Sequence, residues 1–174
     1  MASPPIEDFV YQHAAFPREL DIQLWAFARL VWGENLSGDA RFRSRSWDDP
    51  PPTHFVRVAG DLLISHALVQ PLRFQTNPGV LRVGGVTAVL TFPQFRREGH
   101  ASAVMRRAGE YIGQTADVGM LFSDVRNVPL YERLGWAALP RGRVLVKDQA
   151  PDDAVMILGE ASVAPNPFRL DSSW

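Results

Sequence analysis

The sequence predicts a mixed α/β fold with a mostly antiparallel central sheet flanked by helices. Three observations support this prediction. The chain has 174 residues, 46% of them hydrophobic, which suits one globular domain with a substantial core. Apolar residues at helical spacing alternate along the chain with short runs rich in Val, Ile, Leu and Phe. Turn residues separate three successive strand patterns, which favours antiparallel neighbours. We therefore expect a single domain over residues 1–174.

The N-terminal part contains one strand and one helix. Phe9–Ala14 is short, aromatic and β-prone. Glu19–Trp32 then places its apolar residues on one helical face, at Leu20, Leu24, Phe27, Ala28 and Val31. We expect this helix to end near Gly33, where a left-handed residue closes it. Residues 36–53 are polar and end in three prolines, so they form a long surface loop or a short second helix.

Three strands and two turns form the middle of the chain. His54–Ala59, Leu62–Pro71 and Val80–Phe92 are rich in β-branched and aromatic residues. Gly60-Asp61 and Asn77-Pro78-Gly79 separate them with turn-forming residues. The three strands are therefore predicted to form an antiparallel meander.

The C-terminal part returns to alternating helices and strands. Ala101–Thr115 has apolar residues at helical spacing and is the clearest predicted helix. Val118–Ser123 is typical of a buried strand, and Arg126–Leu134 of a helix with a proline in its first turn. Further strands are expected after Trp136. The main candidates are Arg143–Lys147 and Val155–Glu160.

Composition excludes several classes of function. A net charge of -1 gives no general attraction to nucleic acid or to an anionic membrane. The absence of cysteine excludes disulfides, thiolate metal sites and a cysteine nucleophile. No apolar run is long enough to span a bilayer, and the N-terminus lacks the pattern of a signal peptide. We expect a cytoplasmic protein, and the near absence of lysine suggests a GC-rich bacterial genome.

The four histidines, His13, His54, His66 and His100, have no metal-ligand spacing, so no metal site is expected. Residues 96–101 (RREGHA) lie between a predicted strand and the clearest predicted helix. A glycine at a helix start turns backbone N–H groups toward one point, and the helix dipole adds positive charge there. The segment is therefore either a phosphate-binding turn or an ordinary loop with two solvated arginines.

Two motifs in order resemble the signatures of the GNAT superfamily of acyl-CoA N-acyltransferases. The first is the strand 86–92 followed by Arg96-x-x-Gly99-x-Ala101, similar to that family's acetyl-CoA-binding motif. The second is the run 121–136, which ends in Tyr131-x-x-x-Gly135-Trp136. Together they cover about a third of the chain. The resemblance implies the GNAT fold, whose order of elements matches the one predicted above.

The resemblance also implies roles for individual residues. Leu90 and Thr91 would contact the pantetheine and the thioester carbonyl through main-chain groups, and Tyr131 would be the general acid facing the CoA sulfur. Asp124 stands where the family often has Asn as a pantetheine contact. Backbone amides of the loop would hold the CoA pyrophosphate. The loop comprises Arg96, Arg97, Glu98, Gly99, His100, Ala101 and Ser102.

Without cysteine, direct attack of an amine on acetyl-CoA in a ternary complex is the expected route. The general base stays open, because the strand Val86–Phe92 carries no carboxylate. His66, an acidic residue from elsewhere and a chain of waters are the alternatives, and His66 in an apolar strand is also typical of a satisfied core histidine. Tyr131 is alternatively a core aromatic residue whose hydroxyl bonds to the backbone.

A looser resemblance concerns the amine. Residues 54–74 and the C-terminal end look like the aminoglycoside 2′-N-acetyltransferases, in which a terminal Trp carboxylate and a nearby Asp line the site of a polycationic sugar. By position these are Trp174 and Asp171, with Thr87 standing where the family has a carboxylate and His66 nearby. Trp174 is alternatively a hydrophobic plug, and Asp152-Asp153 a turn. Carboxylates in the loop would add negative charge, namely Asp39, Asp48 and Asp49.

Two alternatives to an acetyltransferase are kept open. A CoA-binding regulatory or structural module without catalysis would explain the missing strand carboxylate. A transferase of longer acyl chains would share both motifs. The predicted acceptor is a small-molecule amine, and a homodimer would pair through a late strand, Arg143–Lys147 or Val155–Glu160.

Overall fold

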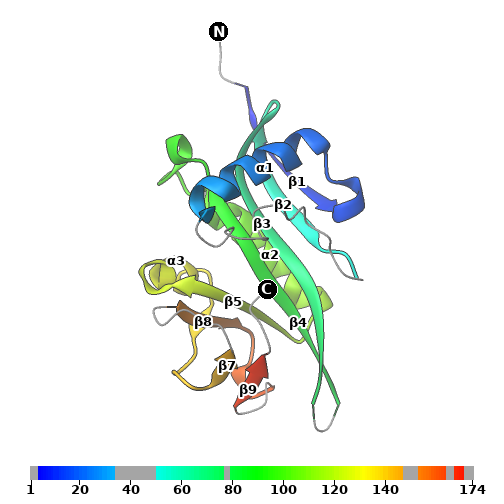
Figure 1. Cartoon of the computed structure of the whole chain (residues 1–174), viewed down its shortest axis with the longest axis vertical. Coiled ribbons are helices and arrows are strands. Elements are labelled where there is room, and N and C mark those ends of the chain that lie inside the picture. The colour runs from blue at the N-terminus through cyan, green and yellow to red at the C-terminus, as the bar shows by residue number, and fades with distance from the viewer. Residues whose placement is uncertain (1–3, 34–49, 77–78, 147–152, 164–166, 171–174) are drawn as a thin grey trace. The chain divides into compact units, whose positions relative to one another are not determined.

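The computed structural model describes residues 4–33, 50–76, 79–146, 153–163 and 167–170 (Figure 1). Its helices and strands follow the predicted order. They are β1 Ile6–Gln12, α1 Arg18–Val31, β2 Thr53–Ala59, β3 Leu62–Gln75, β4 Val80–Thr91, α2 His100–Thr115, β5 Val118–Asp124, α3 Val128–Glu132, β6 Ala137–Ala138, β7 Val144–Val146, β8 Asp153–Leu158 and β9 Phe168–Leu170. Short 3-10 turns lie between some of them, namely η1 His13–Ala15, η4 Pro93–Phe95, η5 Val125–Asn127 and η6 Ala161–Val163.

The main sheet has the strand order β1-β2-β3-β4-β5-β8-β6, and β7 pairs with β9 in a second, two-stranded sheet. β1–β2, β5–β8 and β6–β8 are antiparallel, whereas β4–β5 is parallel. The predicted fold class, a mixed and mostly antiparallel sheet with helices, is confirmed. No helix in the described ranges is long and apolar enough to cross a membrane.

The chain divides into two compact units, which are described separately. Unit 1 comprises Met1–Leu68 and Ala88–Val104, and unit 2 comprises Val69–Thr87 and Met105–Trp174. β3, β4 and α2 each contribute residues to both units. The single domain over residues 1–174 stays a prediction.

In unit 1, α1 covers β2, β3 and β4 with one apolar face. Leu20, Leu24 and Phe27 pack with Val56, Val58, Leu63 and Leu90 in one buried cluster. Phe27 also stacks on Phe92, with ring centroids 4.5 Å apart. Each such buried side chain contributes about 1.5 to 3 kcal/mol. The helix ends at Val31, two residues before the predicted glycine, and the Trp32 N–H that follows bonds to the Ala28 carbonyl.

In unit 2, two glycines let α2 approach the sheet closely. Gly84 of β4 pairs with Gly119 of β5 in the parallel register. A Cβ at Gly84 would lie 2.6 Å from Cγ1 of Ile112, and one at Gly119 would lie 3.3 Å from its Cδ1. Ile112, which is 2% exposed, therefore occupies the space that two missing side chains leave.

Two predicted elements differ from the structure. The strand predicted over Phe9–Ala14 begins and ends earlier, because the pairing of β1 with β2 stops at Gln12 and the Phe16 N–H then bonds back to the His13 carbonyl. The helix predicted over Arg126–Leu134 is only α3, after the 3-10 turn η5. It ends early because the Leu134 and Trp136 N–H groups both bond to the Tyr131 carbonyl.

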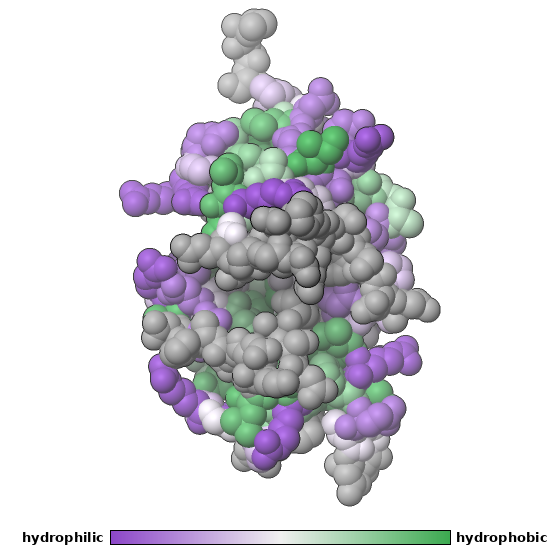
Figure 2. Space-filling view, viewed as in Figure 1, coloured by the Kyte–Doolittle hydropathy of each residue, from purple (hydrophilic) through white to green (hydrophobic). Residues whose placement is uncertain are grey.

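The remaining strands are close to their predicted positions. β8 replaces the strand predicted over Val155–Glu160 and has β5 on one side and β6 on the other. β7 lies within the predicted Arg143–Lys147, of which Lys147 is outside the described residues. Polar residues cover much of the described surface on the face drawn in Figure 2, with apolar residues between them, as is usual for proteins.

Candidate active site

The turn between β4 and α2 has the backbone geometry of an anion-binding site. Arg97 and Gly99 both have positive φ values, 69° and 84°. Nothing lies within 4 Å of a Cβ built at Gly99, so the glycine serves the backbone conformation and not a close contact. α2 begins at His100, and the Ala103 N–H bonds to the Gly99 carbonyl. The first N–H groups of a helix have no partner within it and attract an anion.

The side chains of this turn mostly support its shape. The Arg96 Nε donates to the Thr91 carbonyl over 3.2 Å, which ties the turn to the end of β4. His100 is 6% exposed, and its Nε2 lies 3.2 Å from the Glu98 carboxylate. Arg97 is exposed, whereas Ala101 and Ser102 are half-buried in the first turn of α2. Backbone amides and the exposed guanidinium of Arg97 are thus the groups that this turn offers to a ligand.

The end of β4 is held by three consecutive residues of β3. The Phe92 N–H bonds to the Ile64 carbonyl, the Ser65 hydroxyl donates to the Leu90 carbonyl, and the His66 Nδ1 lies 2.8 Å from the Ala88 carbonyl oxygen. The Ser65 Oγ also lies 2.9 Å from the Thr91 Oγ1. These contacts fix alternate residues of the strand. Sequence reasoning missed Ser65, which no spacing rule connects with Leu90.

His66 and Thr87 have different surroundings. His66 is fully buried, and its second ring nitrogen, Nε2, lies 3.0 Å from the His54 Nδ1. Both of its ring nitrogens are thus engaged, as in a satisfied core histidine, and neither is open to a substrate amine in this geometry. Thr87 is half-buried on β4, directly before Ala88. Thr87 carries no group that takes a proton from an ammonium.

Tyr131 is a buried residue of α3 in unit 2. It is 6% exposed, and burial raises the pKa of its hydroxyl above the usual 10.0, while a hydrogen bond with Ser123 acts in the opposite direction. Gly135 has a φ of 85°, which reverses the chain so that the Trp136 N–H bonds to the Tyr131 carbonyl over 3.1 Å. The two rings meet edge to face, with centroids 6.4 Å apart. The spacing Tyr-x-x-x-Gly-aromatic therefore has a local structural reason.

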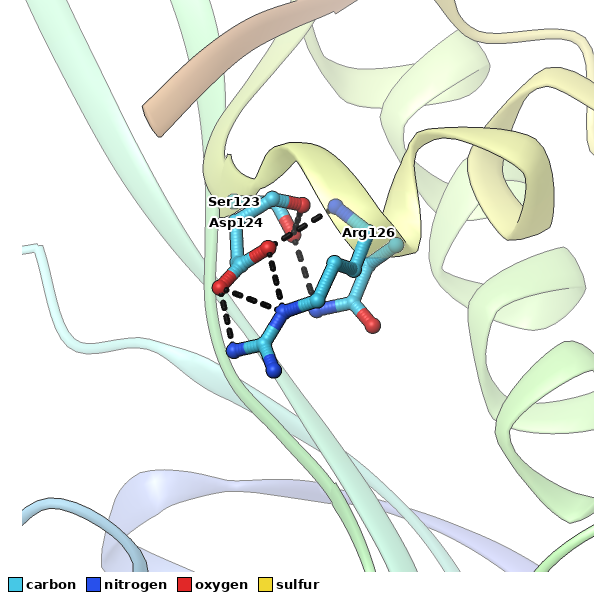
Figure 3. A network of polar contacts seen from close by, with 4 residues as sticks. Ser123, Asp124 and Arg126 are labelled. Carbon is cyan, nitrogen blue, oxygen red and sulfur yellow. Dashed lines mark hydrogen bonds and ion pairs between the residues drawn. The ribbon is translucent and has the colours of Figure 1, made fainter. Parts of the chain in front are cut away.

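Asp124 ends β5 and binds a neighbour two residues along the chain (Figure 3). Its carboxylate accepts from Nε and Nη2 of Arg126, with a shortest distance of 2.6 Å, and from the Arg126 N–H over 2.8 Å. These bonds lower the pKa of Asp124 to about 2. In this geometry the Asp124 carboxylate, which was predicted to contact pantetheine, is already bound to the Arg126 guanidinium. The Asn127 Nδ2 lies 3.3 Å from the Ser123 Oγ beside it.

Comparison with known proteins places the chain in a family. The family model described as "Acetyltransferase (GNAT) domain" matches residues 22–139, which is more than half of the chain. The chain belongs to the GNAT acetyltransferases. Both motifs from which the resemblance was inferred lie within the matched residues. A search of the curated proteins finds no match.

Three solved structures with the same fold illustrate the likeness. Escherichia coli ElaA is 12% identical, with a TM-score of 0.65 over 88% of this chain and 99% of the other. An acyl-CoA N-acyltransferase from Pseudomonas aeruginosa is 13% identical, with a TM-score of 0.64 over 89% and 100%. An aminoglycoside 6′-N-acetyltransferase complexed with coenzyme A is 14% identical, with a TM-score of 0.64 over 86% and 95%. At these identities the likeness shows the GNAT fold alone.

The residues predicted to bind the amine lie mostly outside the described ranges. Asp171 and Trp174 are among them, as are the loop carboxylates Asp39, Asp48 and Asp49. The finer resemblance to aminoglycoside 2′-N-acetyltransferases is not confirmed by the comparisons. Among the described residues of this GNAT chain, no group of three or more His, Asp or Glu side chains could hold a metal ion.

Proposed function

We propose that this GNAT chain transfers an acetyl group from acetyl-CoA to a primary amine of a small molecule, by direct attack in a ternary complex. The observation that carries the proposal is the left-handed turn at Arg97 and Gly99 ahead of α2. Its residues suit the CoA pyrophosphate, because backbone amides and a helix N-terminus there provide positive charge. Arg96 to Ser102 are the residues that would hold it.

Main-chain groups of Leu90 and Thr91 would contact the thioester. A developing oxyanion needs a preorganised donor, and one such donor is worth about 3 to 4 kcal/mol where measured. The Ser65 hydroxyl donates to the Leu90 carbonyl over 2.8 Å. Donation to a carbonyl polarises its peptide group and strengthens the N–H on the other side, here that of Thr91. This contact supports Thr91 as the oxyanion donor.

Tyr131 would donate a hydrogen bond to the leaving thiolate. An ordinary tyrosine has a pKa near 10 against about 8.5 for a thiol, so complete proton transfer is uphill by roughly 2 kcal/mol. Burial raises the pKa of Tyr131 further, which makes complete transfer less favourable still. The residue therefore acts by a hydrogen bond that strengthens as negative charge grows on sulfur.

Direct attack is proposed because the chain contains no cysteine for a covalent acyl intermediate. The base that receives the amine proton would be an acidic residue from elsewhere or a chain of waters. His66 is less suited, because both of its ring nitrogens are engaged in a fully buried position.

An aminoglycoside-like polyamine is the proposed acceptor, with Asp171 and Trp174 as its ligands. Carboxylates around a cleft favour charged amines. The support is the sequence resemblance at the chain end. The second candidate for the donor is a longer acyl-CoA thioester, and the proposed assembly is a homodimer. Of the two segments proposed for pairing, β8 is already paired with β5 and β6, which favours β7.

The test is release of free CoA thiol from acetyl-CoA with a panel of aminoglycosides, polyamines and short peptides. The protein has no thiol of its own, so the signal has no protein background. Turnover with aminoglycosides supports Asp171 and Trp174 as acceptor ligands, whereas turnover with another amine alone removes that role. Parallel assays with longer acyl-CoA thioesters report the acyl preference.

Tyr131→Phe distinguishes an enzyme from a CoA-binding module without catalysis. We expect it to lower kcat about 100-fold or more while acetyl-CoA affinity stays unchanged. Tyr111→Phe on α2 is the matched control and should keep normal turnover. If acetyl-CoA binds but no amine accelerates thiol release in the unmodified protein, the non-catalytic module is the better account.

A further inference from the structure

Three of the four histidines form a row of hydrogen bonds within unit 1. The His13 Nδ1 lies 3.0 Å from the His54 Nε2, and the His54 Nδ1 lies 3.0 Å from the His66 Nε2. The row ends where the His66 Nδ1 lies 2.8 Å from the Ala88 carbonyl oxygen. His13 is half-buried, whereas His54 and His66 are both 0% exposed. Phe16 stacks on His54, with ring centroids 4.0 Å apart.

The acceptor at the end of the row determines where every proton lies. A carbonyl oxygen only accepts, so the His66 Nδ1 must carry a proton. In a neutral row the His66 Nε2 then accepts, which places a proton on the His54 Nδ1, and by the same reasoning one on the His13 Nδ1. Each of the three contacts contains one proton.

The row ends at an unusual point of β4. Ala88 has a φ of 51°, one of two positive values for non-glycine residues in the described part of the chain. A side chain disfavours this conformation, which persists only where its surroundings hold it. Ala88 is buried within the strand, and its carbonyl is the group that His66 contacts. The parallel register of β4 with β5 covers Val83–Val86 and stops just before this bend.

We infer that His66 is a positioning residue for acyl transfer: its Nδ1–H holds the Ala88 bend, and His54 and His13 keep it in the tautomer that donates. The inference rests on the proposed function, because the main chain that follows the bend, Leu90 and Thr91, is the segment proposed to contact the thioester. Displacing reacting groups by about 1 Å costs on the order of 100-fold in rate. His66 acts through the backbone and does not touch substrate.

The first experiment reads the tautomers directly, by ¹⁵N NMR of the histidine rings at a pH where they are neutral. We expect His54 and His66 as Nδ1–H tautomers. His100 is the control in the same spectrum, because its Nε2 faces the Glu98 carboxylate over 3.2 Å and should carry the proton. An Nε2–H tautomer of a neutral His66 overturns the inference, whether or not the protein is an enzyme.

The second experiment compares two substitutions in the full chain. His66→Leu removes the donor and should lower kcat about 10-fold to 100-fold, measured at a temperature at which circular dichroism shows a folded protein. His66→Asn keeps an amide donor at about the position of Nδ1 and should recover most of the rate. A folded His66→Leu variant with unchanged kcat and KM overturns the inference. If His66→Leu does not fold, the Ala88 carbonyl ¹³C shift of His66→Asn shows whether the contact with Ala88 is kept. A kept contact must then accompany a nearly normal rate, and a lost contact must accompany the rate loss; the opposite pairing overturns the inference.

A failure of the proposed function is distinguishable from a failure of this inference. If the unmodified protein transfers no acetyl group to any amine, the tautomer measurement still applies, and positioning is tested on acetyl-CoA affinity. His66→Leu should then weaken that affinity at least about fivefold through the displaced main chain of Leu90 and Thr91. An unchanged affinity overturns the inference.

Discussion

The two compact units hold their functional segments by different means. In unit 1, buried side chains bond to the main chain of β4, through Ser65 to Leu90 and through His66 to Ala88. In unit 2, close packing and a left-handed turn set positions: Gly84 and Gly119 leave room for Ile112, and Gly135 positions Trp136 after Tyr131. Polar contacts fix the direction of individual peptide groups, whereas close packing fixes the distance between elements.

This difference separates two kinds of substitution. Changes to the packing around Gly84 in unit 2 should act mainly on the free energy of unfolding and leave the activity of each folded molecule nearly unchanged. Changes to the buried hydrogen bonds of unit 1 should cost less stability and more activity.

Gly84→Val is expected to have the largest effect on stability. The new Cβ would lie 2.6 Å from Cγ1 of Ile112, and overpacking of this kind costs about 3 kcal/mol. Urea unfolding measures the loss. Gly113→Ala on helix α2, next to Ile112, is the control, because nothing lies within 4 Å of its new Cβ, and it should stabilise by about 0.5 to 1 kcal/mol.

A double-mutant cycle tests whether the lost stability of Gly84→Val comes from crowding against Ile112. If Gly84→Val and Ile112→Ala are combined, the loss should be smaller than the sum of the single losses, because the added methyl groups fill the space of the removed side chain. Strict additivity would show that Gly84 is not required for the approach of Ile112.

Gly135→Ala should cost about 1 to 2 kcal/mol of the free energy of unfolding, through its backbone conformation. Its φ is 85°, and the nearest atom to a new Cβ, Leu158 Cδ1, lies 3.9 Å away, so crowding contributes little. Gly142→Ala is matched in conformation, with a φ of 81° and nothing within 4 Å. Both should lose similar stability. Activity should fall only in Gly135→Ala, because the Trp136 N–H bonds to Tyr131.

Ser65→Ala should cost about 1 kcal/mol and lower kcat several-fold, since the buried Leu90 carbonyl loses its donor. Thr115→Ala is the control: its hydroxyl also donates to a carbonyl over 2.8 Å, that of Tyr111, but on an exposed part of α2. Thermal unfolding and steady-state kinetics measure both. If the two variants lose the same stability and the same kcat, burial of the Ser65 hydrogen bond is not the cause of its effect.

The sequence predicted the parts of this site that depend on near neighbours. The order of elements follows from periodicity and turn residues, and the turn at Gly99 follows from a glycine ahead of a helical pattern. The bond between Asp124 and Arg126 was not predicted, although it spans only two residues and its short spacing in the sequence is a usable signal. The short helix α3 was overestimated, because the chain reversal at Gly135 competes with helical periodicity.

The parts that escaped prediction are made by tertiary contacts. The histidine row joins η1, β2, β3 and β4, and its members are 41 and 12 residues apart in the sequence. No local pattern distinguishes His13 or His54 from ordinary polar residues. The positive φ of Ala88 also could not be inferred, because alanine has no preference for that conformation.

The smallest expected effect concerns the exposed ion pair of unit 2. Arg126→Gln should return the pKa of Asp124 from about 2 toward its usual 3.8, because the lost hydrogen bonds are the main cause of the lowering. Because the pKa of Asp124 is lower in the folded than in the unfolded protein, its ion pair stabilises the fold at pH values above the unfolded-state pKa. This contribution disappears as the pH falls through about 2. Carboxyl ¹³C NMR follows the titration, with Asp117, which pairs with Arg82, as the unaffected control. An unchanged pKa of Asp124 in this variant would mean that a group other than the Arg126 side chain lowers it. Since solvent and salt screen an exposed pair, stability near neutral pH should hardly change.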